Sequence, residues 1–280
     1  MAPRLSFGRP RARTVTLFAL AALAIAIAAT PAGRMTWYGA RAWLADTSQF
    51  TQCTPDPRIW CEPGAEAFGA ALAPLLPAAT LRVEAAFGMP FTATVRVQVY
   101  ASRESFSRHS GVTPQAAGAV SLGLVHLSPR LAPAGSDEEA VVMHELAHLH
   151  LIQRIGAMGI GKLPNWLWEG LPTYLSGGGG ARNTSRANAK YALLHGRRFE
   201  PEDGASLLFP KSAGAYGLEH GMYYLQASLL LEWMDHKDPQ AFRHMLAALG
   251  EGQGLDAALA ASYKKPMAAL WQEFLSTLND

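Results

Sequence analysis

A long apolar stretch, residues 140–155, contains the sequence His-Glu-Leu-Ala-His at positions 144–148. Residues four apart lie on the same face of a helix, so His144 and His148 would project from one side among apolar neighbours. Histidines on an apolar face are more often hydrogen-bonded core residues than metal ligands. Two histidines at this spacing, with Glu145 between them, instead favour a metal-binding helix with a buried face.

Signals for both ends of this helix flank the stretch. Ser136 and Glu139 form a capping-box pattern, which predicts a helix start at residue 136. Gly156 and Gly159 offer C-terminal stops. His150 lies on another face of the helix and is predicted to be a partly buried or surface histidine outside the metal site.

A third ligand must come from further along the chain, because Leu151 and Arg154 stand where an extended motif would have a glycine and a histidine. Glu169 is the strongest candidate. It follows a helix-start signal at Pro164 and lies in an aromatic, apolar segment, where an unpaired carboxylate is costly to bury. A solvated acid on an amphipathic helix is the alternative. Three ligands on one Zn²⁺ would leave a fourth position for water, with Glu145 placed to accept its proton.

The motif and the segment Trp166–Tyr174, which contains Glu169 and Gly170, resemble the gluzincin branch of zinc metallopeptidases. This is the thermolysin-like group with a glutamate as third ligand, and the small bacterial peptidase-MA-like domains are the most similar. The resemblance covers residues 92–278, including the helical segments 224–233 and 252–271. It implies that peptide bonds are hydrolysed by a metal-activated water on Zn²⁺, with Glu145 as general base.

The resemblance also implies a donor for the developing oxyanion near residues 220–224. Tyr224 matches the pattern best, and Tyr223 and His220 are alternatives, although tyrosines beside leucines on a helix are often core residues. Pro172 stands where similar sequences have alanine. It predicts a kink just after Glu169 or a new helix that begins there.

Residue patterns predict strands over 92–100 and 121–128. Gly177–Gly180 is expected to be a flexible run. The resemblance adds a zincin-like α+β fold, in which a small mixed sheet packs on the zinc-binding helix and a helical C-terminal lobe follows. The strand over 121–128 would then line the cleft and pair with an extended peptide. Helices are expected over 66–87 with a bend at Pro74 and Pro77, around Lys190, and over 216–235, 239–249, 255–263 and 266–278.

The N-terminal residues carry the pattern of an export signal. Four arginines within residues 1–13 precede an apolar run from Val15 to Ala29. This predicts a signal peptide over 1–32, cleaved after Ala28 or Ala32, or an uncleaved anchor that attaches residues 15–32 to a membrane. We therefore expect an exported protein of the bacterial periplasm or cell envelope.

The predicted mature chain has three parts. Residues 33–91 form an N-terminal segment, 92–185 carry the sheet and the ligand helices, and 186–280 form the helical lobe. Residues 33–62 are expected to be a tether with a disulfide loop between Cys53 and Cys61, the only cysteines; their contribution to a zinc site is the alternative.

The composition argues against a nucleic-acid partner, because the chain has a formal net charge of only +2 and no basic patch. A metallopeptidase acting on a peptide or protein substrate is the leading hypothesis. The alternative is a non-catalytic cell-envelope binding or scaffold protein with the same fold. A membrane-anchored regulator that processes itself is a third. The presence of Glu145 favours the peptidase, because a scaffold needs no base beside its metal.

Overall fold

The strands form one mixed sheet in the computed structural model, which describes residues 31–131, 137–181, 183–202 and 211–278. The strand order is β1-β2-β3-β5-β4, with β2, β3 and β5 parallel and the two edge strands antiparallel to their neighbours. The predicted combination of helices with a small mixed sheet is therefore present. The strands are β1 (Thr51–Gln52), β2 (Ile59–Cys61), β3 (Val97–Val99), β4 (Gly118–Ser121) and β5 (Leu124–Leu127).

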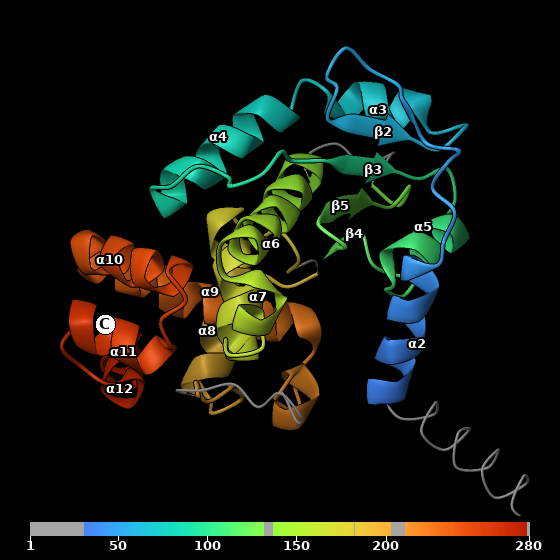
Figure 1. The fold of residues 1–280 in the computed structure, drawn as a ribbon. Helices are drawn as coiled ribbons and strands as arrows, with labels where there is room; N and C mark the ends of the chain where they lie inside the picture. The colour runs from blue at the N-terminus through green and yellow to red at the C-terminus, as the bar shows by residue number, and fades with distance from the viewer. Residues whose placement is uncertain (1–30, 132–136, 182, 203–210, 279–280) are drawn as a thin grey trace, which may run out of the picture.

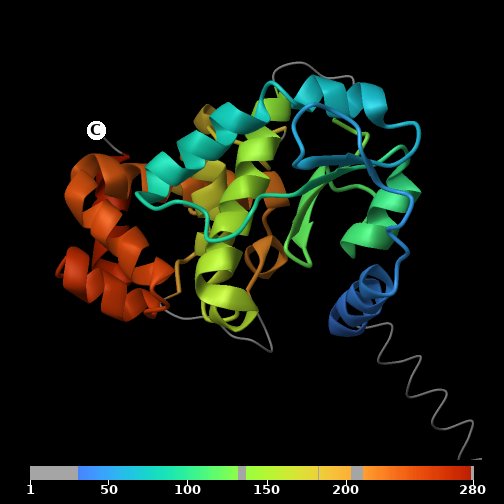
Figure 2. The ribbon, with the colours of Figure 1, turned by 45° about the horizontal axis from the view of Figure 1, so that its top comes forward.

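Helix α6 runs through the middle of the molecule, with the sheet on one side and the C-terminal helices on the other (Figures 1 and 2). It packs against β4, β5, α4 and α7, and α7 in turn packs closely on α9. The helices are α2 (Pro31–Trp43), α3 (Glu66–Leu72), α4 (Leu76–Phe87), α5 (Arg103–Ser110), α6 (Asp137–Ile160), α7 (Asn165–Leu175), α8 (Arg186–Leu194), α9 (His220–Lys237), α10 (Pro239–Gly250), α11 (Leu255–Ser262) and α12 (Met267–Thr277), with a 3-10 turn at Ala213–Tyr216.

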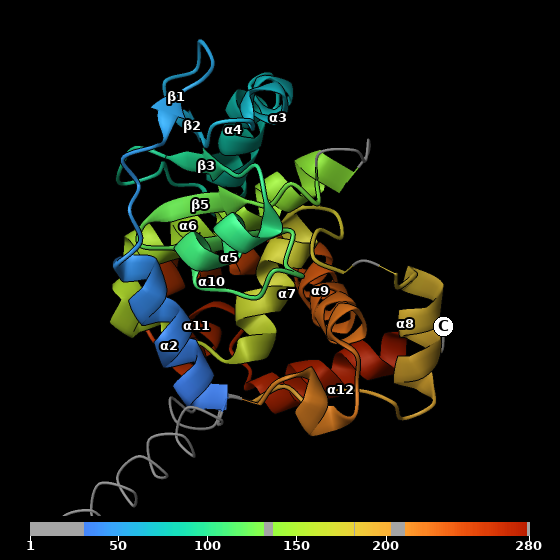
Figure 3. The same cartoon turned by 90° about the vertical axis from the view of Figure 1, so that its right-hand side faces the viewer.

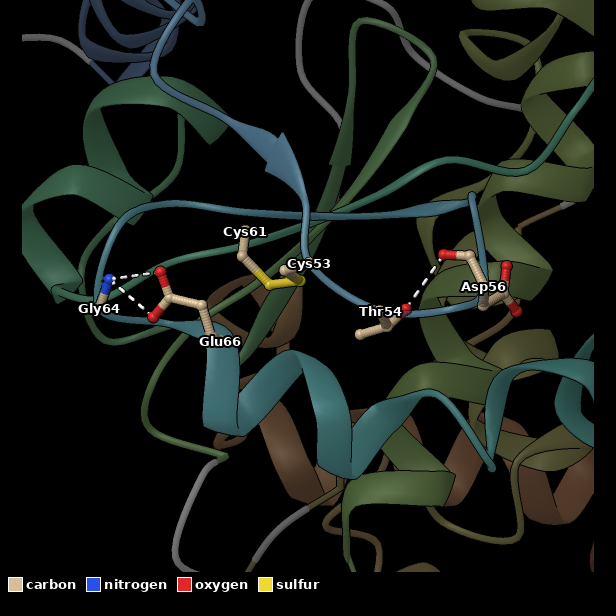
Figure 4. The surroundings of a disulfide bond; sticks show 6 residues. All are labelled: Cys53, Thr54, Asp56, Cys61, Gly64 and Glu66. Carbon is tan, nitrogen blue, oxygen red and sulfur yellow. Dashed lines mark hydrogen bonds between the residues drawn. A yellow bond between two sulfur atoms is a disulfide. The ribbon is translucent and has the colours of Figure 1, made fainter.

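The N-terminal segment is part of the fold, so the prediction of a tether over 33–62 is wrong. Helix α2 packs on α5, and β1 and β2 extend the sheet, with β2 pairing in parallel with β3. The predicted disulfide between Cys53 and Cys61 is present and lies against α3 (Figure 4). Gly69 allows this contact, because a Cβ there would lie 2.4 Å from the sulfur of Cys61.

Both predicted strands are shorter than expected. The stretch 92–100 contributes only Val97–Val99 to the sheet. The stretch 121–128 is the second half of a hairpin, because β4 ends at Ser121 and β5 begins at Leu124. Leu122 and Gly123 have φ of 52° and 76°, which is the geometry of a two-residue hairpin turn whose backbone twist matches the strands.

Breaks in the helices follow the proline and glycine signals. The predicted helix 66–87 is divided into α3 and α4, which are bent by 48°. In α6, Gly156 has φ 67° and ψ 169°, so the regular helix ends at the predicted stop.

The capping position Ser136 and the predicted signal up to residue 30 lie outside the described residues. Within the described ranges, no single helix is long and apolar enough to cross a membrane; α3 and α4 reach that length and hydropathy only as a bent pair.

Candidate metal centre

The two motif histidines project from the same side of α6 and are almost fully buried. His144 is 4% exposed and His148 is 6% exposed, and their Nε2 atoms lie 3.1 Å apart. Each imidazole therefore directs a ring nitrogen toward a shared point. The burial follows from the apolar run of α6, which is covered by the sheet, α4 and α7.

Glu169 on α7 completes a group of three ligands. Its Oε2 atom lies 3.7 Å from the Nε2 atom of His144 and 3.7 Å from that of His148. A circle through a triangle with sides of 3.1, 3.7 and 3.7 Å has a radius of about 2.0 Å, which matches zinc–nitrogen and zinc–oxygen bond lengths. The residues thus fit a metal ion, as predicted from the motif and the distant glutamate.

Helix α7 holds Glu169 in place despite the internal proline. The predicted new helix at Pro172 is not found, because α7 runs without interruption from Asn165 to Leu175. The neighbouring Gly170 brings α7 close to α9: a Cβ at Gly170 would lie 2.6 Å from the Cβ of Ala227. This close packing fixes the depth at which Glu169 reaches toward α6.

Glu145 lies beside the ligand group and differs from Glu169 in its protonation. Burial raises the pKa of Glu145 to about 7, with the charge of Glu169 adding to the shift and that of His144 opposing it. Burial also acts to raise the pKa of Glu169, but the imidazoles of His144 and His148, each 3.7 Å away, outweigh it, and the net pKa falls well below the usual range. One carboxyl is therefore ionised as a ligand requires, and the other is suited to exchanging protons near neutral pH.

Helix α9 brings Tyr224 and His220 to the site, but not Tyr223. The ring of Tyr224 lies 6.4 Å from that of His144, and His220 lies 6.3 Å from Tyr224. Burial raises the pKa of Tyr224, and the carboxylates of Glu169 and Glu145 raise it further, so its hydroxyl stays protonated. Tyr223 is 1% exposed and packs against aromatic core residues, so among the three predicted donors it is the one in a packing role.

The ligand group opens into a cavity of about 690 Å³. One wall is the segment 112–120, which ends in the edge strand β4 and consists largely of small or apolar residues. The opposite side includes Trp168, whose ring centre lies 4.2 Å from that of His148, together with His220 and Tyr224. Arg130 also lines the cavity and donates to the carbonyl oxygen of Gln115. The stretch 121–128, which was predicted to line the cleft, contributes no residue to this cavity; the wall at 112–120, Trp168 and Arg130 were not predicted.

Glycines at three positions permit close contacts around the site. A Cβ at Gly118 would lie 2.7 Å from Oε1 of Glu145, and one at Gly180 would lie 2.8 Å from the ring of His144. A Cβ at Gly179 would lie 2.3 Å from the carbonyl oxygen of Ala140 on α6. The second half of the glycine run predicted to be flexible, Gly179 and Gly180, is therefore packed against α6, whereas a Cβ at Gly177 or Gly178 would meet nothing within 4 Å.

The remaining histidine of α6 lies elsewhere. His150 takes no part in the ligand group, as predicted, but it is fully buried rather than partly buried or at the surface. No known protein-family profile matches the sequence, and no curated protein is significantly similar to it.

Proposed function

We propose that this protein is a zinc-dependent metallopeptidase of the gluzincin type, with a zincin-like fold, that hydrolyses peptide bonds. The observation that carries the proposal is the position of Glu145: a buried carboxyl that is not one of the three candidate ligands lines the same cavity as they do. Zinc sites that only stabilise a fold normally have four protein ligands, whereas catalytic sites have three and an open position.

The chemistry would divide between the metal and Glu145. A bound zinc ion would lower the pKa of a water molecule and polarise the substrate carbonyl. Glu145 takes one proton from the water as the water oxygen bonds to the carbonyl carbon. It then passes that proton to the amide nitrogen as the carbon–nitrogen bond breaks, so one water is consumed and a carboxylic acid and an amine are released.

Tyr224 is proposed as the donor to the developing oxyanion. Its raised pKa keeps the hydroxyl protonated, so that the O–H can donate a hydrogen bond when negative charge appears on the carbonyl oxygen. His220 also lines the cavity and is the alternative donor.

The edge strand β4 is proposed to bind the substrate backbone. It ends the sheet, so one side of its backbone has no neighbouring strand among the described residues. An extended peptide that pairs with this edge would pass over Gly118, next to Glu145. The small residues at 116–118 leave room for the side chains of such a peptide.

Export remains part of the proposal. A disulfide between Cys53 and Cys61 is typical of proteins that fold in an oxidising compartment. Together with the signal-like residues 1–32, it supports a location in the bacterial cell envelope, with attachment through residues 15–32 if these are not removed.

The decisive experiment measures bound zinc and cleavage of a peptide library by the purified protein and by Glu145→Gln. We expect one zinc per chain in both, and at least about a hundredfold slower hydrolysis in the variant, because it lacks its base. Glu138→Gln, on the same helix but outside the cavity, is the matched control and should cleave normally.

Well under one zinc per chain, or undiminished hydrolysis by Glu145→Gln, would refute the proposal. Full zinc content without any cleavage by the unaltered protein would favour the non-catalytic scaffold.

A further inference from the structure

The outer side of α2 is an apolar face that no other described residue covers. Trp37, Trp43 and Leu44 are 61%, 74% and 74% exposed. At helical spacing they gather with Ala40 on one side, and Arg41 projects at its border, where it is half-buried. Two of the seven tryptophans in the chain are thus exposed on the same helix, although tryptophan is usually largely buried.

The inner side of α2 fixes the direction of this face. Ala42 is buried and Tyr38 half-buried where α2 packs on α5. Gly111, at the end of α5, permits the contact: a Cβ there would lie 3.2 Å from the carbonyl oxygen of Tyr38. After the helix, the carbonyl oxygen of Asp46 lies 3.0 Å from Nε2 of His109. The outer face therefore points away from the body, at the edge of the molecule (Figures 1 and 3).

We propose that this face of α2 docks on the surface of a lipid bilayer. The apolar run Val15–Ala29 ends immediately before α2 begins at Pro31, so insertion of that run would bring α2 to the membrane surface. Tryptophan favours this position, because its ring lies in the apolar boundary while its N–H reaches water or headgroups. Leucine beside it adds apolar area, as in helices that lie in the membrane interface.

The position of α2 directly after the apolar run favours a membrane as the surface that covers its exposed face. Where residues 15–29 stay attached as an anchor, α2 is held at the membrane surface, whereas a second copy or another protein would first have to be recruited to this face. The inference does not rest on the metal centre or on peptidase activity.

The test uses the full chain in phosphatidylcholine vesicles whose acyl chains carry a bromine quencher near the headgroup. We expect quenching of tryptophan emission, reduced about threefold or more in the double variant Trp37→Ser, Trp43→Ser, because both interfacial rings are then gone. All variants retain residues 15–29, so tethering alone cannot produce the difference. Leu81→Ser, on α4 and 66% exposed in the unaltered chain, is the control and should be quenched like the unaltered protein.

Equal quenching in the double variant and the unaltered chain would overturn the proposal, as would absence of quenching. Sedimentation without lipid tests whether a second copy of the chain binds this face instead. A dimer that dissociates in the double variant would assign the face to that second copy. Circular dichroism checks that the exposed substitutions leave the fold intact.

Discussion

The two faces of α6 carry histidines that are equally buried and chemically different. On one face, His144 and His148 bring their Nε2 atoms within 3.1 Å of each other and within 3.7 Å of Glu169. On the other, His150 stacks on Phe87 with ring centres 4.2 Å apart, and its Nε2 lies 2.9 Å from the carbonyl oxygen of Met89.

The difference lies in what each Nε2 atom faces. The backbone carbonyl oxygen of Met89 accepts from the Nε2 atom of His150, so this nitrogen needs no metal, and the ring serves packing, although its Nδ1 has no partner among the described residues. Two facing Nε2 atoms cannot satisfy each other when both imidazoles present lone pairs, and the nearby carboxylate supplies a further acceptor rather than a second donor. A cation is the partner that suits all three, so burial alone does not separate a ligand from a core histidine.

The strongest test of the difference between the two faces compares the variants His148→Ala and His150→Ala. Loss of His148 removes a direct ligand, and we expect more than about a hundredfold weaker zinc binding, since even loss of an outer hydrogen-bond partner costs 10–100-fold. His150→Ala should retain one zinc per chain but lower the free energy of unfolding by about 2–3 kcal/mol, through lost packing and an unpaired carbonyl.

Zinc titration and urea unfolding of both variants measure these effects. The division between the faces is wrong if a folded His150→Ala protein loses zinc as completely as His148→Ala does.

Chelation tests the metal face without a mutation. Removal of a ligand present at a thousand times its Kd lowers the free energy of unfolding by about 4 kcal/mol. Dialysis against a chelator should therefore lower the melting temperature of the unaltered protein, and added zinc should restore it. His148→Ala should show little response, whereas His150→Ala should respond fully; a chelator that leaves the unaltered protein unchanged would contradict a resident metal.

The ligands were predictable because their signal is local. The spacing of His144 and His148 is a property of one helix, and the cost of burying Glu169 follows from its apolar neighbours. The C-terminal helices from α9 to α12 follow from the same kind of periodicity. Periodicity does not give the direction of a face, and this is why Tyr223 and Tyr224 could be separated only by the structure, which places one in the core and the other in the cavity.

The errors come from contacts distant in sequence. Strands β1 and β2 have two and three residues, too few for an alternating pattern. They form because β3 offers β2 a neighbouring strand and β2 in turn pairs with β1. The hairpin turn was missed because Leu122 adopts a positive φ that asparagine or glycine usually signals. The sequence of the glycine run does not reveal that Gly179 and Gly180 meet α6.

His126 on β5 is a third buried histidine, and it makes the stability of the protein depend on pH. It is 1% exposed, with Nδ1 2.7 Å from the hydroxyl of Tyr100, and burial lowers its pKa to about 4 despite a hydrogen bond with Ser121. Between pH 6.5 and about 4, His126 is protonated in the unfolded chain but neutral in the folded protein. This contribution is fully present above pH 6.5, and about 3 kcal/mol of stability should be lost as the pH falls through that window.

Urea unfolding in the presence of chelator measures this loss without interference from metal release. His126→Gln retains polar contacts with Tyr100 and Ser121 but does not titrate, so its stability should vary less over the same range. Parallel pH curves for the two proteins would contradict the assignment.

The smallest expected effect concerns the base rather than the ligands. A methyl group at Gly118 would meet the side chain of Glu145 at 2.6–2.9 Å, so Gly118→Ala must shift that carboxyl or the edge strand β4. A shift well below 1 Å should slow hydrolysis by about tenfold, since about 1 Å of misplacement can cost a hundredfold. The ligands are untouched, so zinc content and chelator response should be unchanged. Ala117→Gly, a neighbouring change that adds no atoms, is the control; equal loss in both variants would show that β4, and not the position of Glu145, sets the rate.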